Sequence, residues 1–460
     1  MSHIPRIPHA PGTEFMATVN LDEDARQERT GLGNYFVANY PPFSYWKPDH
    51  LGAAREALER PVAGEKPLGL YLHIPFCRKR CKFCYFRVYT DKNAGDIETY
   101  VAALTREVEL LAASPMARNR GVEFVYFGGG TPSYLSAAQL ERLFARVKAH
   151  VPWSSAAEIT FECEPGTLQR HKLEALRASG VTRVSLGVEN FSEALLKSNG
   201  RAHLSEEIFR AYGWIRELGF PQVNIDLIAG MLDESWDNWR DCIAKTLELA
   251  PDCVTIYQME LPYNTVFSKE LRVIGNDEPA GAVADWPTKR AWVDYAYKEL
   301  EKAGYTVTSA TTAVKNASTR FVYRDSLWRG ADMFGTGVAS FGHVGGAHVQ
   351  NLDTWEAYLG AVDKGEVPWA RAYPLSPRER FVREAILLLK KGYWDSADFL
   401  ARHGRDPVAE FSAQVDDLVA MGMANRQAPG LVLSRPGLIQ VDRMLPRFFE
   451  PEHRNYKRYT

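Results

Sequence analysis

The chain has 460 residues, of which 45% are hydrophobic and 24% charged, proportions typical of a globular protein with one large domain and a smaller one. Lysine and arginine, 55 together, nearly balance 57 acidic residues, which argues against a nucleic-acid partner. No window of about twenty apolar residues occurs, so we expect no membrane span; the N-terminus lacks the apolar core of a signal peptide, so we expect a cytoplasmic protein.

Residues 1–65 form an irregular N-terminal extension with a short predicted helix near residues 51–59. Residues 34–46 contain six aromatic residues and two prolines. Such a segment can be an apolar strap across the main domain or part of a binding site, and the two uses are compatible. We interpret it mainly as a strap.

Three cysteines follow the first predicted strand: Cys77, Cys81 and Cys84, with gaps of three and two residues. Three thiolates can hold three irons of a 4Fe-4S cubane cluster and leave the fourth iron open to another ligand. A structural zinc site would need a second Cys or His pair at matching spacing, and none follows in the sequence. Six cysteines in 460 residues are too sparse for a disulfide framework, so we favour the cluster.

From residue 69 onward, short runs of β-branched and aromatic residues alternate with amphipathic helical patterns. This alternation predicts right-handed βαβ crossovers and a parallel sheet. Six units give an α/β fold, a partial (β/α)6 barrel over residues 66–310, whose functional residues should lie at the carboxyl ends of the strands. The expected strands are 69–74, 123–127, 157–162, 183–188, 222–228 and 253–261, and the expected helices include 97–113, 136–150, 205–218 and 235–249.

Candidate site residues follow these strands in chain order. Glycines at a strand end let a ligand approach the backbone where a Cβ would exclude it. An arginine suits a carboxylate, and an aspartate accepts hydrogen bonds from ammonium or hydroxyl groups. The candidates at or after strand ends are Gly129, Gly130, Thr131, Glu162, Glu189, Arg201, Asp226, Tyr257 and Glu260.

Two further regions complete the chain. Residues 311–375 are expected to be a glycine-rich loop with connecting segments. The run from Gly335 to Gly337 lacks the third glycine and the acidic residue of a dinucleotide-binding fingerprint. Residues 376–460 carry helical patterns over 378–390, 395–403 and 408–421 before a short strand pair, which predicts a small winged-helix-like domain. Without a basic face, we expect it to cover the barrel mouth or dock the substrate rather than bind DNA.

The cysteine spacing, with an aromatic residue before the last cysteine, resembles the radical S-adenosylmethionine (SAM) superfamily. The surrounding residues 71–86 resemble the oxygen-independent coproporphyrinogen III oxidase family, including its class C radical methyltransferase relatives. The resemblance implies that Cys77, Cys81 and Cys84 hold a 4Fe-4S cluster whose open iron binds SAM. An electron from a donor such as flavodoxin or ferredoxin would then cleave SAM to a 5′-deoxyadenosyl radical.

The same resemblance assigns roles to the candidate residues. It places Gly337 and Glu260 near a second SAM molecule, so two SAM molecules are expected. The expected catalytic residues are Glu189, Glu260 and Tyr257. The residues expected to contact the first SAM are Tyr71, Gly129, Gly130, Thr131, Glu162, Arg201 and Asp226.

Three residues depart from the oxidase pattern. Phe86 replaces a further cysteine, Glu189 replaces a glutamine, and Glu260 replaces a small residue. The sequence around Tyr257 and His343 also resembles the methylase-like relatives more closely. We therefore expect a monomeric two-SAM enzyme that methylates an sp2 carbon of a small-molecule substrate.

Three alternatives stay open. The first is the oxidase reaction, which decarboxylates tetrapyrrole propionates to vinyl groups, and the second is radical cyclopropanation. The third is a haem chaperone without enzymatic turnover, for which His343 and His348 are available as haem ligands.

Overall fold

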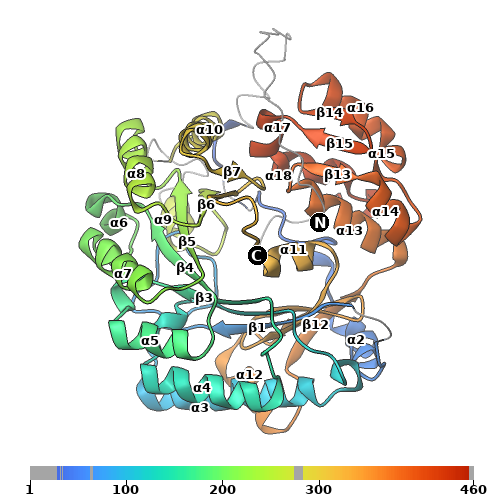
Figure 1. Cartoon of the computed structure of the whole chain (residues 1–460). Coiled ribbons are helices and arrows are strands. Elements are labelled where there is room, and N and C mark those ends of the chain that lie inside the picture. The colour runs from blue at the N-terminus through green and yellow to red at the C-terminus, as the bar shows by residue number, and fades with distance from the viewer. Residues whose placement is uncertain (1–27, 32, 34, 63–65, 274–282, 455–460) are drawn as a thin grey trace.

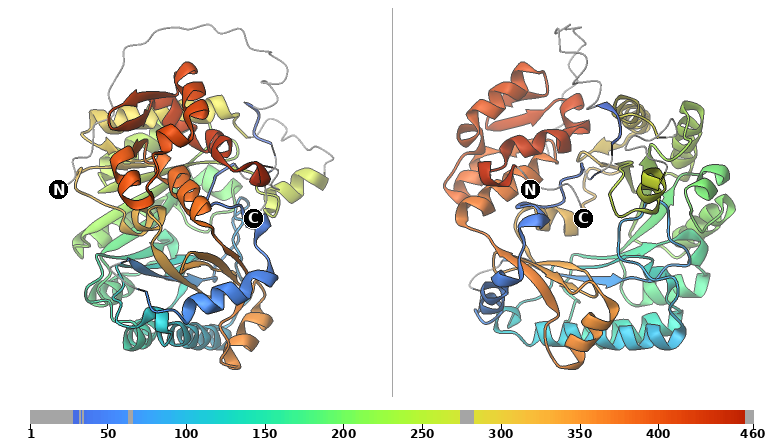
Figure 2. Two further views of the ribbon diagram at one scale, coloured as in Figure 1. Left: turned by 90° about the vertical axis from the view of Figure 1, so that its right-hand side faces the viewer. Right: turned by 180° about the vertical axis from the view of Figure 1, so that it is seen from behind.

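A computed structural model describes residues 28–31, 33, 35–62, 66–273 and 283–454 (Figure 1). Its main feature is a curved sheet of twelve strands with helices on the outer face. The C-terminal helices lie on the opposite side of the molecule from helices α6 to α8 (Figure 2). None of the helices within these residues has the length and apolarity needed to cross a membrane.

The first six strands are parallel and adjacent in chain order, which confirms the partial (β/α)6 barrel. Their side chains are nearly all buried, as expected for a parallel sheet covered by helices. The strands are β1 (Leu68–Ile74), β2 (Phe124–Gly129), β3 (Glu158–Cys163), β4 (Arg183–Glu189), β5 (Gln222–Ala229) and β6 (Cys253–Gln258). The helices between them are α3 (Ala94–Ala112), α4 (Ala137–His150), α5 (Arg170–Ala178), α6 (Glu193–Ser198), α7 (Ser205–Glu217) and α8 (Trp236–Leu249).

The sheet continues beyond both edges of the parallel core. Strand β9 (Asp332–Thr336) pairs in parallel with β1, and three antiparallel strands follow it. Residues 311–375, expected to be a loop with connections, thus extend the main sheet. The added strands are β10 (Phe341–Val344), β11 (Ala347–Asn351) and β12 (Trp369–Pro374) on one side, and β8 (Thr312–Val314) and β7 (Thr306–Val307) on the other. The helices of this half are α9 (Val266–Val273), α10 (Trp286–Lys302), α11 (Val322–Trp328) and α12 (Trp355–Asp363).

The C-terminal part combines helices with a separate sheet of three strands in the order β13-β15-β14. The helix expected over residues 408–421 is two helices, because the chain breaks at Phe411, whose buried ring stacks on Phe381 with centroids 5.9 Å apart. The elements are α13 (Pro377–Leu389), β13 (Tyr393–Asp395), α14 (Ser396–His403), α15 (Pro407–Glu410), α16 (Ser412–Ala420), β14 (Ala424–Gln427), β15 (Gly430–Leu433), α17 (Arg435–Ile439) and α18 (Val441–Met444).

Residues 35–46, which we call the strap, precede helix α2 (Leu51–Leu58). The strap side chains of Val37, Tyr40 and Trp46 are buried. The Tyr40 hydroxyl lies 2.8 Å from Nδ1 of His453, near the C-terminus. The aromatic residues of this segment therefore join the N-terminal and C-terminal parts of the chain.

Candidate active site

The inner face of the sheet, the strap and the C-terminal helices border a cavity of about 1940 Å³. This volume exceeds the roughly 300–1,000 Å³ of a site for one drug-sized ligand. The residues singled out from the sequence that line it are Tyr71, Cys77, Cys81, Cys84, Gly129, Gly130, Thr131, Glu162, Glu189, Arg201, Asp226, Tyr257 and Glu260. The strand-end pattern thus places residues from six strands around one space.

The cysteine loop follows β1 and faces this cavity. The Thr131 hydroxyl donates to Sγ of Cys77 at 3.3 Å, and a guanidinium N–H of Arg201 donates to Sγ of Cys81 at 3.4 Å. Burial raises the pKa of the Cys77 thiol to about 11 and that of Cys84 to about 12. The thiols of Cys77 and Cys84 are therefore neutral at pH 7, and metal binding would have to displace their protons.

Glu162, at the end of β3, is held by the neighbouring strand. Its carboxylate accepts hydrogen bonds from the Gly129 N–H at 3.1 Å and from the Tyr126 hydroxyl at 2.6 Å. Gly129 has φ +113°, and a Cβ there would lie 2.4 Å from Nδ1 of His73, so the site requires glycine. Burial raises the pKa of Glu162 to about 7.

Asp226, on β5, and Glu189, at the end of β4, add two more carboxyl groups. Asp226 accepts hydrogen bonds from Ser185 at 2.7 Å and Asn224 at 2.9 Å, and burial raises its pKa. Glu189 lies 3.6 Å from Arg201, and burial raises its pKa to about 7. A cationic ligand would favour the ionised form of all three carboxyl groups.

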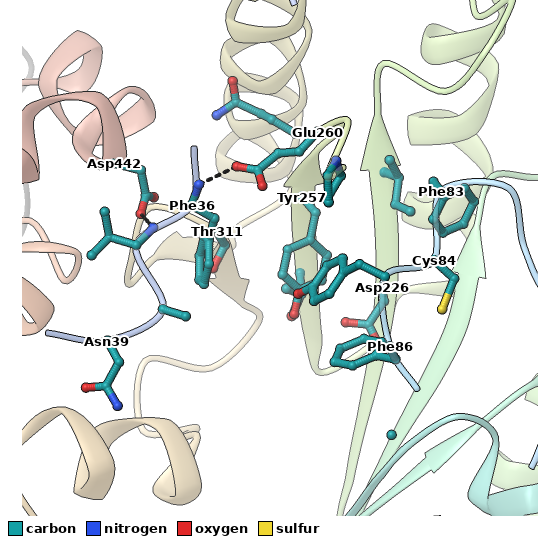
Figure 3. Close-up of a pocket in the computed structure, with 18 of the residues that line it drawn as sticks. Phe36, Asn39, Phe83, Cys84, Phe86, Asp226, Tyr257, Glu260, Thr311 and Asp442 are labelled. Carbon is teal, nitrogen blue, oxygen red and sulfur yellow. Dashed lines mark hydrogen bonds between the residues drawn. The ribbon is translucent and has the colours of Figure 1, made fainter. Parts of the chain in front are cut away.

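Glu260 and Gly337 hold parts of the chain in place. The Glu260 carboxylate accepts hydrogen bonds from the Tyr35 N–H at 3.1 Å and from the Phe36 N–H (Figure 3). The Gly337 N–H donates to the buried carboxylate of Glu107, while the cavity is lined by the neighbouring residues 339–343. Contacts of either residue with a second SAM stay a prediction.

Four aromatic residues that line the cavity are partly exposed: Phe36 by 38%, Tyr85 by 36%, Phe86 by 43% and Tyr257 by 44%. Figure 3 shows Phe36 on one side and Phe86 and Tyr257 on the other. Exposed aromatic rings inside a concave site are typical of a surface that an apolar ligand covers. Sequence reasoning noted Phe86 and Tyr257 for other reasons and did not anticipate this arrangement.

Comparison with known proteins decides the family. Residues 71–245 match the radical SAM superfamily. The chain is 32% identical over 278 residues to the haem chaperone HemW of Escherichia coli, covering 60% of this chain and 70% of that protein. The chain belongs to the radical SAM family of oxygen-independent coproporphyrinogen III oxidases and HemW.

Two further matches extend over most of the chain. The oxygen-independent coproporphyrinogen III oxidase of Synechocystis is 27% identical over 395 residues, which is 82% of this chain and 83% of the relative. The solved structure of coproporphyrinogen III oxidase (HemN) from Escherichia coli covers 91% of this chain and 99% of its own, with a TM-score of 0.77 and 23% identity. The two proteins share a fold.

Membership of the radical SAM family implies a 4Fe-4S cluster, SAM and an electron donor. The cysteine loop fits the cluster, because its three thiols face the cavity and two of them accept hydrogen bonds from Thr131 and Arg201. The three partly buried carboxyl groups of Glu162, Glu189 and Asp226 fit a positively charged cofactor such as SAM.

Proposed function

We propose that this radical SAM enzyme decarboxylates propionate side chains of a tetrapyrrole of the coproporphyrinogen class. The observation that carries the proposal is the single cavity lined by the cysteine loop, the three partly buried carboxyl groups and the four partly exposed aromatic residues. The names of the relatives point the same way, because one group acts on coproporphyrinogen III and the other carries haem. Coproporphyrinogen III and haem are both tetrapyrroles.

The cavity suits such a substrate in size and chemistry. Its volume of about 1940 Å³ corresponds to about two sites of ordinary size, one for SAM and one for a larger partner. The aromatic rings match an apolar ring system. Guanidinium groups around the cavity match carboxylate side chains, since arginine binds carboxylates through paired hydrogen bonds. The arginines that line it include Arg78, Arg80, Arg290, Arg324, Arg443 and Arg447.

Each group of residues has one task in this proposal. When bound, the cluster supplies the electron that cleaves SAM. Glu162, Asp226 and Arg201 bind and orient SAM beside the cysteine loop. The strap covers the cavity and keeps water from the substrate radical, while Phe86 and Tyr257 contact the substrate.

Methyl transfer to an sp2 carbon is the second candidate. It is favoured by Phe86, which projects into the cavity two residues after Cys84, where the resemblance places a cysteine in oxidases. The oxidase reaction ranks first because the relatives include oxidases and haem chaperones and give no support to methylation. The number of SAM molecules bound stays a prediction.

One anaerobic assay separates these candidates. The reconstituted enzyme is incubated with SAM, a reductant and coproporphyrinogen III, and the products are measured by mass spectrometry. Oxidase activity gives vinyl products, carbon dioxide, methionine and 5′-deoxyadenosine. Formation of S-adenosylhomocysteine with a methylated product would support the second candidate. Tight stoichiometric haem binding without any SAM cleavage would overturn both and indicate a haem carrier.

A further inference from the structure

One buried histidine differs from the others in the described part of the chain. The buried histidines are His73, His203, His343, His348 and His453. In four of them both ring nitrogens lie within hydrogen-bond distance of a partner. The exception is His343, for which only Nδ1 has a partner among the described residues.

His343 and His348 form a cross-strand pair. They lie opposite each other on β10 and β11, joined by the turn at Gly345 and Gly346, and their Nδ1 atoms are 3.0 Å apart. The His348 ring stacks on Trp46 of the strap, with centroids 4.8 Å apart and an interplanar angle of 10°. The contact with His343 at the ring edge and the stacking of Trp46 on the ring face therefore fix the orientation of the His348 ring.

The contacts of His348 fix its tautomer. Its Nε2 lies 2.9 Å from the Tyr40 carbonyl oxygen, which can only accept, so Nε2 carries the proton. Burial and the nearby Arg383 guanidinium hold the pKa of His348 well below its usual value, so the ring is neutral. Nδ1 of His348 must then be an acceptor. Asn39 agrees with this, because its oxygen accepts from Arg383 and the Tyr40 N–H, which leaves its NH2 group to face Nδ1 of His348 at 3.4 Å.

The tautomer of His343 follows from that of His348. Since Nδ1 of His348 accepts, Nδ1 of His343 must donate, and burial keeps the His343 ring neutral by lowering its pKa. A neutral imidazole with a proton on Nδ1 has a bare lone pair on Nε2. His343 lines the cavity. Its Nε2 has no hydrogen-bond partner among the described residues, yet it is not one of the fully buried atoms without a partner, so it is accessible. We therefore place this lone pair at the cavity surface.

We propose that His343 is a substrate-binding residue whose bare Nε2 accepts a hydrogen bond from a ring N–H of the bound tetrapyrrole. This inference rests on the proposed substrate class. It assigns a role to a residue that lies outside the cysteine loop and the strand-end carboxylates. A coproporphyrinogen macrocycle carries four pyrrole N–H groups at its centre, and any of them can donate to this lone pair.

The variant His343→Asn tests the inference, because an asparagine amide can reproduce the Nδ1 donor to His348 but cannot reach the position of Nε2. The probe is coproporphyrin III, which has ring N–H groups and a fluorescence that reports binding to the anaerobically reconstituted holoprotein. We expect about tenfold weaker binding by the variant, the size of one neutral hydrogen bond. His150→Asn is the control, since His150 is exposed at the end of α4 and lies outside the cavity lining, and the affinity of this variant should be unchanged.

Zinc coproporphyrin supplies a second, spectroscopic readout. Zinc replaces the ring N–H groups and takes an axial imidazole nitrogen, so wild-type protein should shift the main absorption band to the red, and His343→Asn should not. If His343→Asn binds coproporphyrin III as tightly as the wild-type protein does, and the wild-type protein causes no red shift of the zinc complex, the role of His343 is overturned. The proposed substrate class would still stand. Wild-type protein that binds neither probe would overturn the proposed substrate class as well.

Discussion

Three carboxyl groups, Glu162, Glu189 and Asp226, surround the part of the cavity next to the cysteine loop. Burial disfavours their ionised form, and it raises the pKa of Glu162 and of Glu189 to about 7. In the ligand-free protein, these groups lower the free energy of unfolding as the pH rises from the usual glutamate range to about 7, because the folded state holds more protons than the unfolded state. A bound cation stabilises the ionised carboxylates and so offsets this loss of folding stability.

SAM affinity should therefore depend on pH. The sulfonium of SAM is a permanent cation that favours ionised carboxylates, so affinity should rise between about pH 5 and about pH 8 and level off above the raised pKa values. Calorimetry near pH 6.5, in two buffers with different ionisation enthalpies, should show protons released on binding. Equal affinity and no proton release across this range would contradict the placement of SAM beside these groups.

The cluster assignment is tested by Cys81→Ala. This change removes one of three thiols on the loop, so we expect loss of the cluster's visible absorption, of bound iron and of SAM cleavage after anaerobic reconstitution. Cys242→Ala is the control, because Cys242 is a buried residue of α8 that does not line the cavity. Full iron content and activity in Cys81→Ala would disprove the assignment.

At the scale of elements, Glu107 on α3 holds the connection between β9 and β10. Its buried carboxylate accepts hydrogen bonds from the Gly337 N–H at 2.8 Å, the Asn351 side chain at 2.6 Å and the Tyr358 hydroxyl at 2.7 Å. Burial raises the pKa of Glu107 to about 7. One side chain thus joins α3, the connection between β9 and β10, β11 and α12.

Glu107→Gln should lower the free energy of unfolding by about 2–3 kcal/mol, because the amide NH2 would face a donor and leave buried groups without an acceptor. Urea denaturation measures this change. Glu109→Gln on the same helix is the control, since the Glu109 side chain is 40% exposed beside Arg106 and its replacement should leave the free energy of unfolding nearly unchanged. Equal stability of the two variants would show that the connection between β9 and β10 does not depend on Glu107.

The sequence predicted the elements that carry a strong local pattern. Strands β1 to β5 lie within two residues of their predicted bounds, because buried β-branched and aromatic runs mark them clearly. Strands β9 to β12 were not predicted, since they have four to six residues each and β9 and β10 contain glycines that weaken the pattern. The turn at Gly345 and Gly346, both with positive φ, is a hairpin signal that could have paired His343 with His348.

For the candidate site as well, the sequence predicted what a local pattern marks and missed what depends on contacts between distant segments. The strand pattern placed Glu162, Glu189 and Asp226 on one cavity, because the carboxyl-terminal halves of parallel strands lie toward the same edge of the sheet. Contacts between distant segments gave no such signal: Glu107 and Gly337 are 230 residues apart. The role of Glu260 in binding the strap backbone likewise depends on where two distant segments meet.

At the scale of the whole molecule, the strap joins the sheet to the C-terminal helices. Beyond its bonds to Glu260, the Val37 N–H donates to the carboxylate of Asp442 at 2.8 Å (Figure 3). The buried Lys390 ammonium donates to the Val37 carbonyl at 3.1 Å and to Asp442 at 2.8 Å. The strap, which borders the cavity, is thus held by Glu260 on one side and by Asp442 and Lys390 on the other.

Asp442→Ala should loosen the strap, because it leaves the Val37 N–H and the Lys390 ammonium without their shared acceptor. We expect hydrogen exchange of the Val37 amide to speed up by at least about tenfold, measured by mass spectrometry. Asp416→Ala is the control, since Asp416 pairs with Arg426 at the exposed surface. Unchanged exchange in Asp442→Ala would mean that the aromatic contacts alone hold the strap.

The central claim, hydrogen abstraction from a tetrapyrrole propionate, is tested most directly by isotope transfer. Coproporphyrinogen III deuterated on its propionate methylene carbons is incubated anaerobically with the reconstituted enzyme, SAM and reductant, and 5′-deoxyadenosine is analysed by mass spectrometry. We predict deuterium in 5′-deoxyadenosine together with vinyl products. Turnover of SAM that yields only unlabelled 5′-deoxyadenosine and leaves the propionates intact would contradict the claim.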